Sequence, residues 1–156
     1  MIAKFLIKLR PLAPVVLRIA VGIGFIYHGG QKLFGLWDGP GIQGVMEMTE
    51  KMGFYPPNVW AYLLAVTEFF GGVALIFGAL TAYAAFGLAI AMAVAFFVAH
   101  DGMIGRSLDG RGGGELAFVY LLACISLIFS GPGVLALDNF LKAPEKKTGK
   151  ESGEAK

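Results

Sequence analysis

The stretch LAPVVLRIAVGIGFIYHGGQKL, Leu12–Leu33, is long and apolar enough to cross a membrane as a single helix, yet it contains Arg18, His28 and Lys32. A helix needs about 20 residues to span the hydrocarbon core of a bilayer. Three further stretches reach or approach this length: Val59–Leu80, Ala82–His100 and Gly114–Ser130. The sequence therefore predicts an all-α fold, an integral membrane bundle of four helices.

The amino-acid composition supports a membrane protein. Hydrophobic residues make up 56% of the 156 residues and charged residues only 15%, whereas a soluble domain carries about 25% charged residues. The formal net charge of +2 is small, so nothing indicates a nucleic-acid-binding surface. We expect one four-span domain over residues 1–141, surrounded by membrane lipid, and a disordered basic tail over residues 142–156.

Basic residues predict how the chain sits in the membrane. Three precede the first span, and the tail carries five lysines: Lys142, Lys146, Lys147, Lys150 and Lys156. Lysine and arginine are enriched on the cytoplasmic side of membrane proteins. The sequence therefore predicts a multi-pass protein of the cell (plasma or inner) membrane with both termini in the cytoplasm.

The segments between the spans predict turns and one short extra helix. Only a tight turn at residues 79–81 separates the second and third spans, so these two should form an antiparallel hairpin. In the first outer loop, apolar residues recur at helical spacing and predict a short amphipathic helix: Ile42, Val45, Met46, Thr49 and Met52. After the fourth span, the sequence GPG at residues 131–133 breaks the helix, and we expect the following VLALDNFLK to lie at the membrane interface.

Polar side chains in the first span share one side of its helix. Arg18, Val21, Phe25, His28 and Lys32 are separated by three or four residues, which places them on one stripe. A charged side chain in hydrocarbon costs about 2.5 to 3.5 kcal/mol. We therefore expect this stripe to face the bundle interior or a wet cavity rather than lipid.

The second span carries one charged residue near its middle. Glu68 is followed by Gly71 and Gly72, small residues that let a neighbouring helix approach closely. Arg18 enters the first span from the predicted cytoplasmic side, and its long side chain has the reach to approach the depth of Glu68. The sequence predicts an Arg18–Glu68 ion pair, whose role could be structural or functional.

A second polar group is expected at the outer ends of the helices. His28 and Lys32 end the first span, His100 and Asp101 end the third, and Glu115 begins the fourth. All five should lie at similar depth, although each alone is also typical of an interfacial anchor. Their convergence from three helices predicts a common site.

Several short motifs lie in and beside the spans. They are HGGQKLFG at residues 28–35, EFFGGVALIFG at residues 68–78, the histidine that closes the third span, and GPG followed by Asp138. Together they resemble the DoxX/DoxD family of four-span bacterial and archaeal membrane proteins, over about Val15–Asp138. The resemblance implies association with sulfur and thiol oxidation, because members include the membrane subunit of thiosulfate:quinone oxidoreductase and partners of thiol-handling enzymes.

The residues and the resemblance leave several functions open. In the first, the protein is the quinone-interacting membrane subunit of a sulfur- or thiol-oxidising oxidoreductase, and His28 and Glu68 exchange protons with the quinone. The quinone-binding residues would be Arg18, Lys32, His100 and Glu115. The alternatives are a noncatalytic membrane anchor or assembly partner, a haem-binding bundle with both histidines as ligands, and a small-solute transporter.

The single cysteine limits the redox chemistry that the chain can perform alone. Cys124 lies in an apolar run, so the chain can form neither an internal disulfide nor a Cys-x-x-Cys pair. Electrons must therefore come through a borrowed redox group. The expected partner is a separate redox subunit or a second copy of the chain, the expected cofactor is quinone, and no metal is expected.

Overall fold

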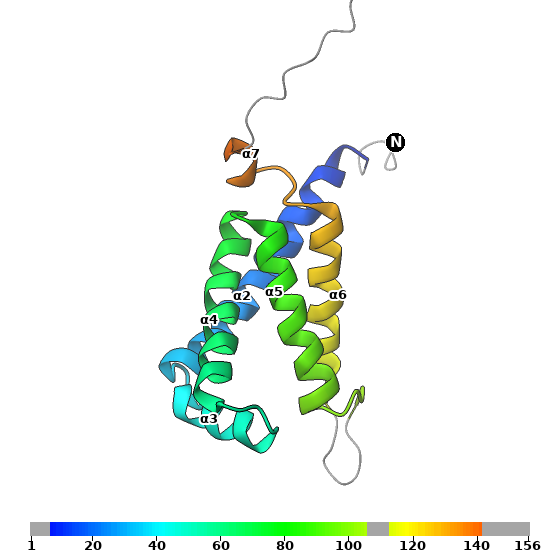
Figure 1. Ribbon diagram of the computed structural model, residues 1–156. Coiled ribbons are helices and arrows are strands. Elements are labelled where there is room, and N and C mark those ends of the chain that lie inside the picture. Colours follow the sequence, from blue (N-terminus) through cyan, green and yellow to red (C-terminus); the bar gives the residue numbers. More distant parts are fainter. Residues whose placement is uncertain (1–6, 106–112, 142–156) are drawn as a thin grey trace, which may run out of the picture.

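The computed structural model describes residues 7–105 and 113–141, and within these ranges it contains helices and no strand (Figure 1). The four main helices are α2 (Ala13–Phe34), α4 (Pro57–Phe77), α5 (Thr81–Val94) and α6 (Glu115–Ser130). The 3-10 helix η1 (Arg10–Leu12) leads into α2, and the π-helical turn η2 (Ala95–Ala99) extends α5. The ends of each predicted span lie within three residues of the ends of an observed helix, when α5 and η2 are taken as one helix. The four predicted spans are therefore confirmed as helices.

Three of these helices are long and apolar enough to cross a membrane. Within the described residues they are Ile7–Phe34, Pro57–Phe77 and Thr81–Ala99, while α6 is apolar but has only 16 residues. The short fourth span agrees with the sequence, which gave this span the fewest residues. The chain is therefore an all-α membrane helical bundle.

Prolines and glycines set the ends of the long helices. Pro14 lies in the first turn of α2 and Pro57 begins α4, where a missing amide hydrogen leaves no helical bond unmade. α2 ends at Gly35 (φ +67°) and α4 ends at Gly78 (φ +64°). Both caps have the left-handed conformation that favours glycine.

Consecutive long helices run antiparallel, which gives the bundle two distinct ends (Figure 1). The start of α2 lies at the same end as the short helix α7 (Asp138–Leu141), and we call this the α7 end. At the other end, α3 (Gly41–Lys51) lies beside the start of α4, and we call this the α3 end. The side of the membrane that each end faces stays a prediction, and the predicted tail, residues 142–156, lies outside the described residues.

Helices α2 and α4 pack with almost no space between their backbones. A Cβ atom added at Gly22 would lie 2.8 Å from Gly72 O, and one added at Gly29 would lie 2.4 Å from Phe69 N. Real Cβ atoms do not approach backbone this closely, so a side chain at either glycine would force the helices apart. Small residues at such crossings are typical of membrane bundles, where close packing drives helix association. This contact fixes the register of α2 against α4.

Replacing Gly29 with alanine is expected to destabilise the bundle, by about 1 to 3 kcal/mol, because the added methyl group overpacks a backbone contact. Gly87 on α5 is a matched control, since a Cβ there would lie 3.4 Å from the Thr67 methyl group, an ordinary contact. Gly87→Ala should be neutral or stabilising by up to about 1 kcal/mol through helix propensity. The reactivity of Cys124, the single and fully buried cysteine, can be followed on heating in mild detergent. Equal melting temperatures for the two variants would contradict the close α2–α4 contact.

The predicted amphipathic helix in the first loop is confirmed as α3. Its apolar side buries Val45 and Thr49, while most other α3 side chains are partly or fully exposed. The Thr49 hydroxyl oxygen lies 2.9 Å from Met46 O and 3.1 Å from Pro57 O. This side chain therefore ties α3 to the first residue of α4.

The segment after α6, residues 133–138, is held against the α7 end by backbone and side-chain bonds. Leu137 N donates to Phe77 O at 3.2 Å and Asp138 N donates to Gly78 O at 2.9 Å. The Asp138 carboxylate accepts hydrogen bonds from Leu80 N at 2.6 Å and Thr81 N at 2.9 Å. Asp138 thus caps the first turn of α5, whose own N-cap residue supplies no side-chain bond.

Candidate functional site

A cavity of about 270 Å³ lies at the α3 end of the bundle, among α2, α4, α5 and α6. Its charged and histidine side chains are His28, Lys32, Glu68 and His100, and the rest of its lining is Phe25, Met92, Ala95, Gly113, Leu116, Ala117 and Tyr120. We call this space the histidine cavity. Of the five residues predicted to converge, the structure brings His28, Lys32 and His100 to this cavity, whereas Asp101 and Glu115 do not line it. The functional roles of these residues stay predictions.

The ion pair in this cavity joins Lys32 and Glu68. Lys32 Nζ lies 2.5 Å from both carboxylate oxygens of Glu68. Glu68 is only 1% exposed, whereas the Lys32 side chain is 23% exposed. The close contact between Gly29 and Phe69 explains this partnership. Lys32 follows Gly29 by three residues, nearly one helical turn, and Glu68 is the neighbour of Phe69 in α4.

The polar stripe of α2 faces the bundle, as predicted. Arg18, Val21 and Phe25 are buried, and His28 and Lys32 are half-buried where the helix reaches the histidine cavity. The stripe therefore changes along its length, from a closed interior at the α7 end to a cavity wall at the α3 end.

The π-helical turn η2 directs His100 into the cavity. His100 N donates to Ala95 O at 3.1 Å, a bond between residues five apart. In a regular α-helix, residue 100 would lie about 140° around the helix from residue 95. The wider π turn instead brings His100 nearly above Ala95, on the cavity face. π turns of this kind recur at functional sites.

Aromatic side chains form one wall of the cavity. The rings of Phe25 and Tyr120 are 5.1 Å apart between centroids, and those of His28 and Tyr120 are 6.4 Å apart. A Cβ atom at Gly24 would lie 2.0 Å from the Tyr120 hydroxyl oxygen, so this glycine makes room for it. Tyr120 was not among the predicted site residues, although a lone tyrosine in the apolar fourth span is a signal, since a buried hydroxyl needs a partner.

Comparison with known protein families identifies the family of this chain. The DoxX family model matches residues 13–101, which include His28, Lys32, Glu68 and His100 of the cavity. The chain belongs to the DoxX family. The family resemblance seen in the sequence motifs is thereby confirmed, and the matched range runs from the start of α2 to just beyond His100.

Two curated relatives match most of this DoxX protein. An "Uncharacterized protein" of Haemophilus influenzae is 36% identical over 133 residues, which is 85% of this chain and 92% of the relative. A Bacillus subtilis protein named "Putative oxidoreductase CatD" is 28% identical over 127 residues, which is 81% of this chain and 85% of the relative. No solved structure gives a significant match.

The predicted Arg18–Glu68 pair is wrong. Arg18 Nη2 of this DoxX protein donates to Leu135 O and lies 3.5 Å from Val134 O, at the α7 end. The register fixed at Gly22 and Gly29 is the reason, because it places Arg18 against Gly78, where an added Cβ would lie 1.8 Å from Nη1. Arg18 is therefore not brought to the histidine cavity, and its assignment as a quinone-binding residue has no geometric support.

Glu115 lies beside the histidine cavity but does not line it. Its carboxylate accepts a hydrogen bond from Gly105 N at 3.2 Å, across the connection between α5 and α6. This contact joins the start of α6 to the loop that follows His100. The geometry thus assigns Glu115 a role in holding the loop, and its predicted role in binding a cofactor stays a prediction.

The donor and acceptor groups of the cavity suit a small planar ligand with oxygen atoms. Lysine, histidine and tyrosine can donate hydrogen bonds, a carboxylate or a neutral imidazole can accept a proton, and the Phe25–Tyr120 wall offers a flat apolar surface. The volume of about 270 Å³ lies near the lower limit for ligand pockets. The four pyrrole rings of a haem need far more room than this volume.

Proposed function

We propose that this DoxX protein is the quinone-interacting membrane subunit of an oxidoreductase system that oxidises sulfur compounds or thiols. One observation carries the proposal: a cavity lined by two histidines and a lysine–glutamate pair lies among the membrane-spanning helices at the α3 end of the bundle. Charged groups inside membrane bundles are costly and commonly mark ligand or proton pathways. The oxidoreductase named among the relatives supports the same class of chemistry.

Each polar residue of the cavity has a distinct part in this proposal. Lys32 and His100 donate hydrogen bonds to the quinone oxygens, since both line the cavity and carry donor groups. His28 and Glu68 exchange protons with the ring oxygens, because an imidazole can both accept and donate a proton and a carboxylate can pass a proton to a neighbour. Tyr120 and Phe25 hold the flat face of the ring.

Quinone, when bound, accepts two electrons and two protons and becomes quinol. The electrons leave a sulfur compound or thiol that is oxidised on a separate redox subunit, because the single cysteine of this chain is buried in the apolar core. The protons come through the cavity residues. This DoxX chain thus supplies the membrane half of the reaction, and the partner supplies the electron donor.

Binding of decylubiquinone to the purified full chain tests this proposal. We expect saturable binding by wild type and about tenfold weaker binding by His28→Leu, because the ring loses a hydrogen-bond partner and the cavity loses a polar wall. Tyr83→Phe is the matched control, since Tyr83 is 78% exposed on α5 and does not line the cavity. Equilibrium binding in mild detergent measures all three.

Two results would contradict the quinone proposal. One is equal affinity of wild type and His28→Leu, which would place any bound quinone elsewhere. The other is the absence of saturable binding by a folded wild-type chain, which would favour the noncatalytic anchor or assembly partner.

A further inference from the structure

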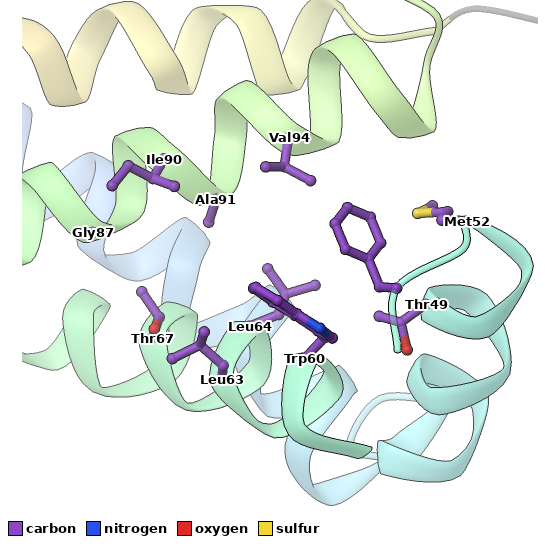
Figure 2. A pocket seen from close by; sticks show the side chains of 11 residues that line it. Thr49, Met52, Trp60, Leu63, Leu64, Thr67, Gly87, Ile90, Ala91 and Val94 are labelled. Carbon is purple, nitrogen blue, oxygen red and sulfur yellow. The ribbon is translucent and has the colours of Figure 1, made fainter. Parts of the chain in front are cut away.

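A second cavity, of about 260 Å³, lies between α4 and α5 on the part of the bundle nearest α3 (Figure 2). Trp60, Leu63 and Leu64 of α4 and Ile90 and Val94 of α5 line its two sides, and Met52 closes it beside α3 (Figure 2). No residue that lines the histidine cavity also lines this space. It is therefore a separate site with different chemistry, and we call it the apolar cavity.

The apolar cavity is continuous with the hydrocarbon-facing surface of the bundle. Leu63 and Ile90 line it from opposite helices, yet each is more than half exposed, and Trp60 is 41% exposed. We expect large exposed apolar residues on these two membrane-spanning helices to face lipid. The cavity therefore opens sideways toward the bilayer interior, between α4 and α5.

The polar atoms in its wall already have partners or point away. Trp60 Nε1 donates to Tyr55 O at 3.3 Å, and the Thr49 hydroxyl lies within hydrogen-bond distance of two backbone carbonyls. Thr67 presents its methyl group toward Gly87. An occupant thus gains nothing from polar groups inside this cavity, and a plain hydrocarbon suits it best.

Gly87 indicates that the space is kept open. Glycine inside a helix is unfavourable relative to alanine, and most glycines within the described transmembrane helices are explained by a close neighbour. At Gly22, Gly29 and Gly72, an added Cβ would lie 2.8 Å or less from a backbone atom. At Gly87 the nearest atom, a methyl carbon, would lie 3.4 Å away. Helix packing does not require this glycine, and its missing side chain enlarges the cavity instead.

We propose that the apolar cavity holds one acyl chain of a membrane phospholipid, with the head group outside the cavity at the α3 end. An empty apolar space forfeits dispersion contacts with its walls, and bilayer lipid is present around the protein as its solvent. Mass action therefore favours an acyl chain over a scarcer isoprenoid tail. This inference does not depend on the quinone proposal, which concerns the histidine cavity.

Native mass spectrometry of the full chain tests this inference, with dioleoyl phosphatidylglycerol added after delipidation in mild detergent. Wild type should retain one phospholipid under activation that removes all others. Gly87→Phe should bind it at least about tenfold more weakly, since a phenyl ring displaces two or more methylene groups. Val94→Trp is a second filling variant, tolerated because Val94 is partly exposed, and Val119→Phe is the control on the exposed face of α6.

The results divide cleanly between the possible occupants. Loss of the retained phospholipid in Val94→Trp and in any folded Gly87→Phe, with retention in Val119→Phe, supports the acyl-chain site. Equal retention in wild type and the filled variants overturns it. So does retention of ubiquinone-10 in place of phospholipid when the two are added together in equal amounts, which would assign the cavity to an isoprenoid tail. A lipid-free dimer that the filling substitutions separate would assign this face to a second copy of the chain.

Discussion

Lys32→Met is expected to destabilise the protein more than Glu68→Leu, although both substitutions break the same ion pair. Glu68 is 1% exposed, so removal of the lysine charge leaves a carboxylate buried without its cation. Breaking a buried pair in this way costs about 3 to 5 kcal/mol in soluble proteins. Lys32 is 23% exposed, and without Glu68 its amine can extend toward water. The cost of Glu68→Leu should therefore be nearer the value for an exposed pair, about 1 kcal/mol.

The double variant separates a structural pair from a functional one. Lys32→Met with Glu68→Leu should recover most of the stability lost in Lys32→Met, because apolar replacement of both partners is often neutral. Thermal exposure of Cys124 measures the stability of all three variants. If the pair belongs to the quinone site, the double variant should be folded yet bind decylubiquinone poorly, since the donor and the carboxylate are both gone. Normal quinone binding by the double variant would remove the pair from the site, and equal stability of the single variants would contradict the difference in burial.

The sequence predicts which residues face inward much better than it predicts their partners. The three- and four-residue spacing from Arg18 to Lys32 depends only on the geometry of one helix, and the observed stripe agrees with it. The partner of Glu68 depends on the register between two helices. That register is set where Gly22 and Gly29 contact the α4 backbone, and no pattern within either helix fixes it. The prediction compared only the depth of each residue along its span, and it therefore named Arg18 instead of Lys32 as the partner of Glu68.

The histidine cavity shows the same division. The convergence of His28 and His100 follows from the topology of an antiparallel bundle, because both lie at helix ends of the same side. The π turn at Ala95–Ala99 does not follow, since the apolar sequence AFFVA fits an α-helix equally well. Tyr120 was missed for a related reason: its place on the cavity wall depends on the packing of α6 against α2, with Gly24 providing the space.

The segment at residues 133–138 was expected at the membrane interface, and the structure shows a more specific role at the α7 end. Its backbone bonds to the end of α4, and Asp138 caps α5. Asp138 is a long-range cap within the same chain, because it lies 58 and 57 residues from its two amide donors, Leu80 N and Thr81 N. Capping signals in sequence are local, so the sequence around Leu80 gives no indication of it.

Asp138→Ala is expected to be among the most destabilising single substitutions in the chain, because Asp138 has two roles at once. It caps α5 through Leu80 N and Thr81 N, a contribution of about 1 kcal/mol. It is also the negative charge with which the buried Arg18 interacts. Loss of that charge leaves a guanidinium, 1% exposed, without its counter-charge. We expect the loss of this nearby negative charge to add to the cost of the lost cap, because burial already disfavours the charged guanidinium.

Asp138→Asn and Arg18→Met separate these two roles. Asparagine keeps an oxygen that can accept one of the capping bonds but removes the charge. If the interaction with Arg18 contributes more stability than the cap, Asp138→Asn should destabilise the protein about as much as Asp138→Ala. Arg18→Met should be milder than either, because Nε and Nη1 of Arg18 have no hydrogen-bond partner among the described residues and their burial is already unfavourable. Adding Arg18→Met to Asp138→Ala should then restore stability, leaving only the lost cap.

Melting temperatures from Cys124 reactivity measure each variant. If Asp138→Asn behaves like wild type while Asp138→Ala unfolds, capping alone accounts for Asp138, and Arg18 is stabilised by its carbonyl contacts at Val134 and Leu135 instead.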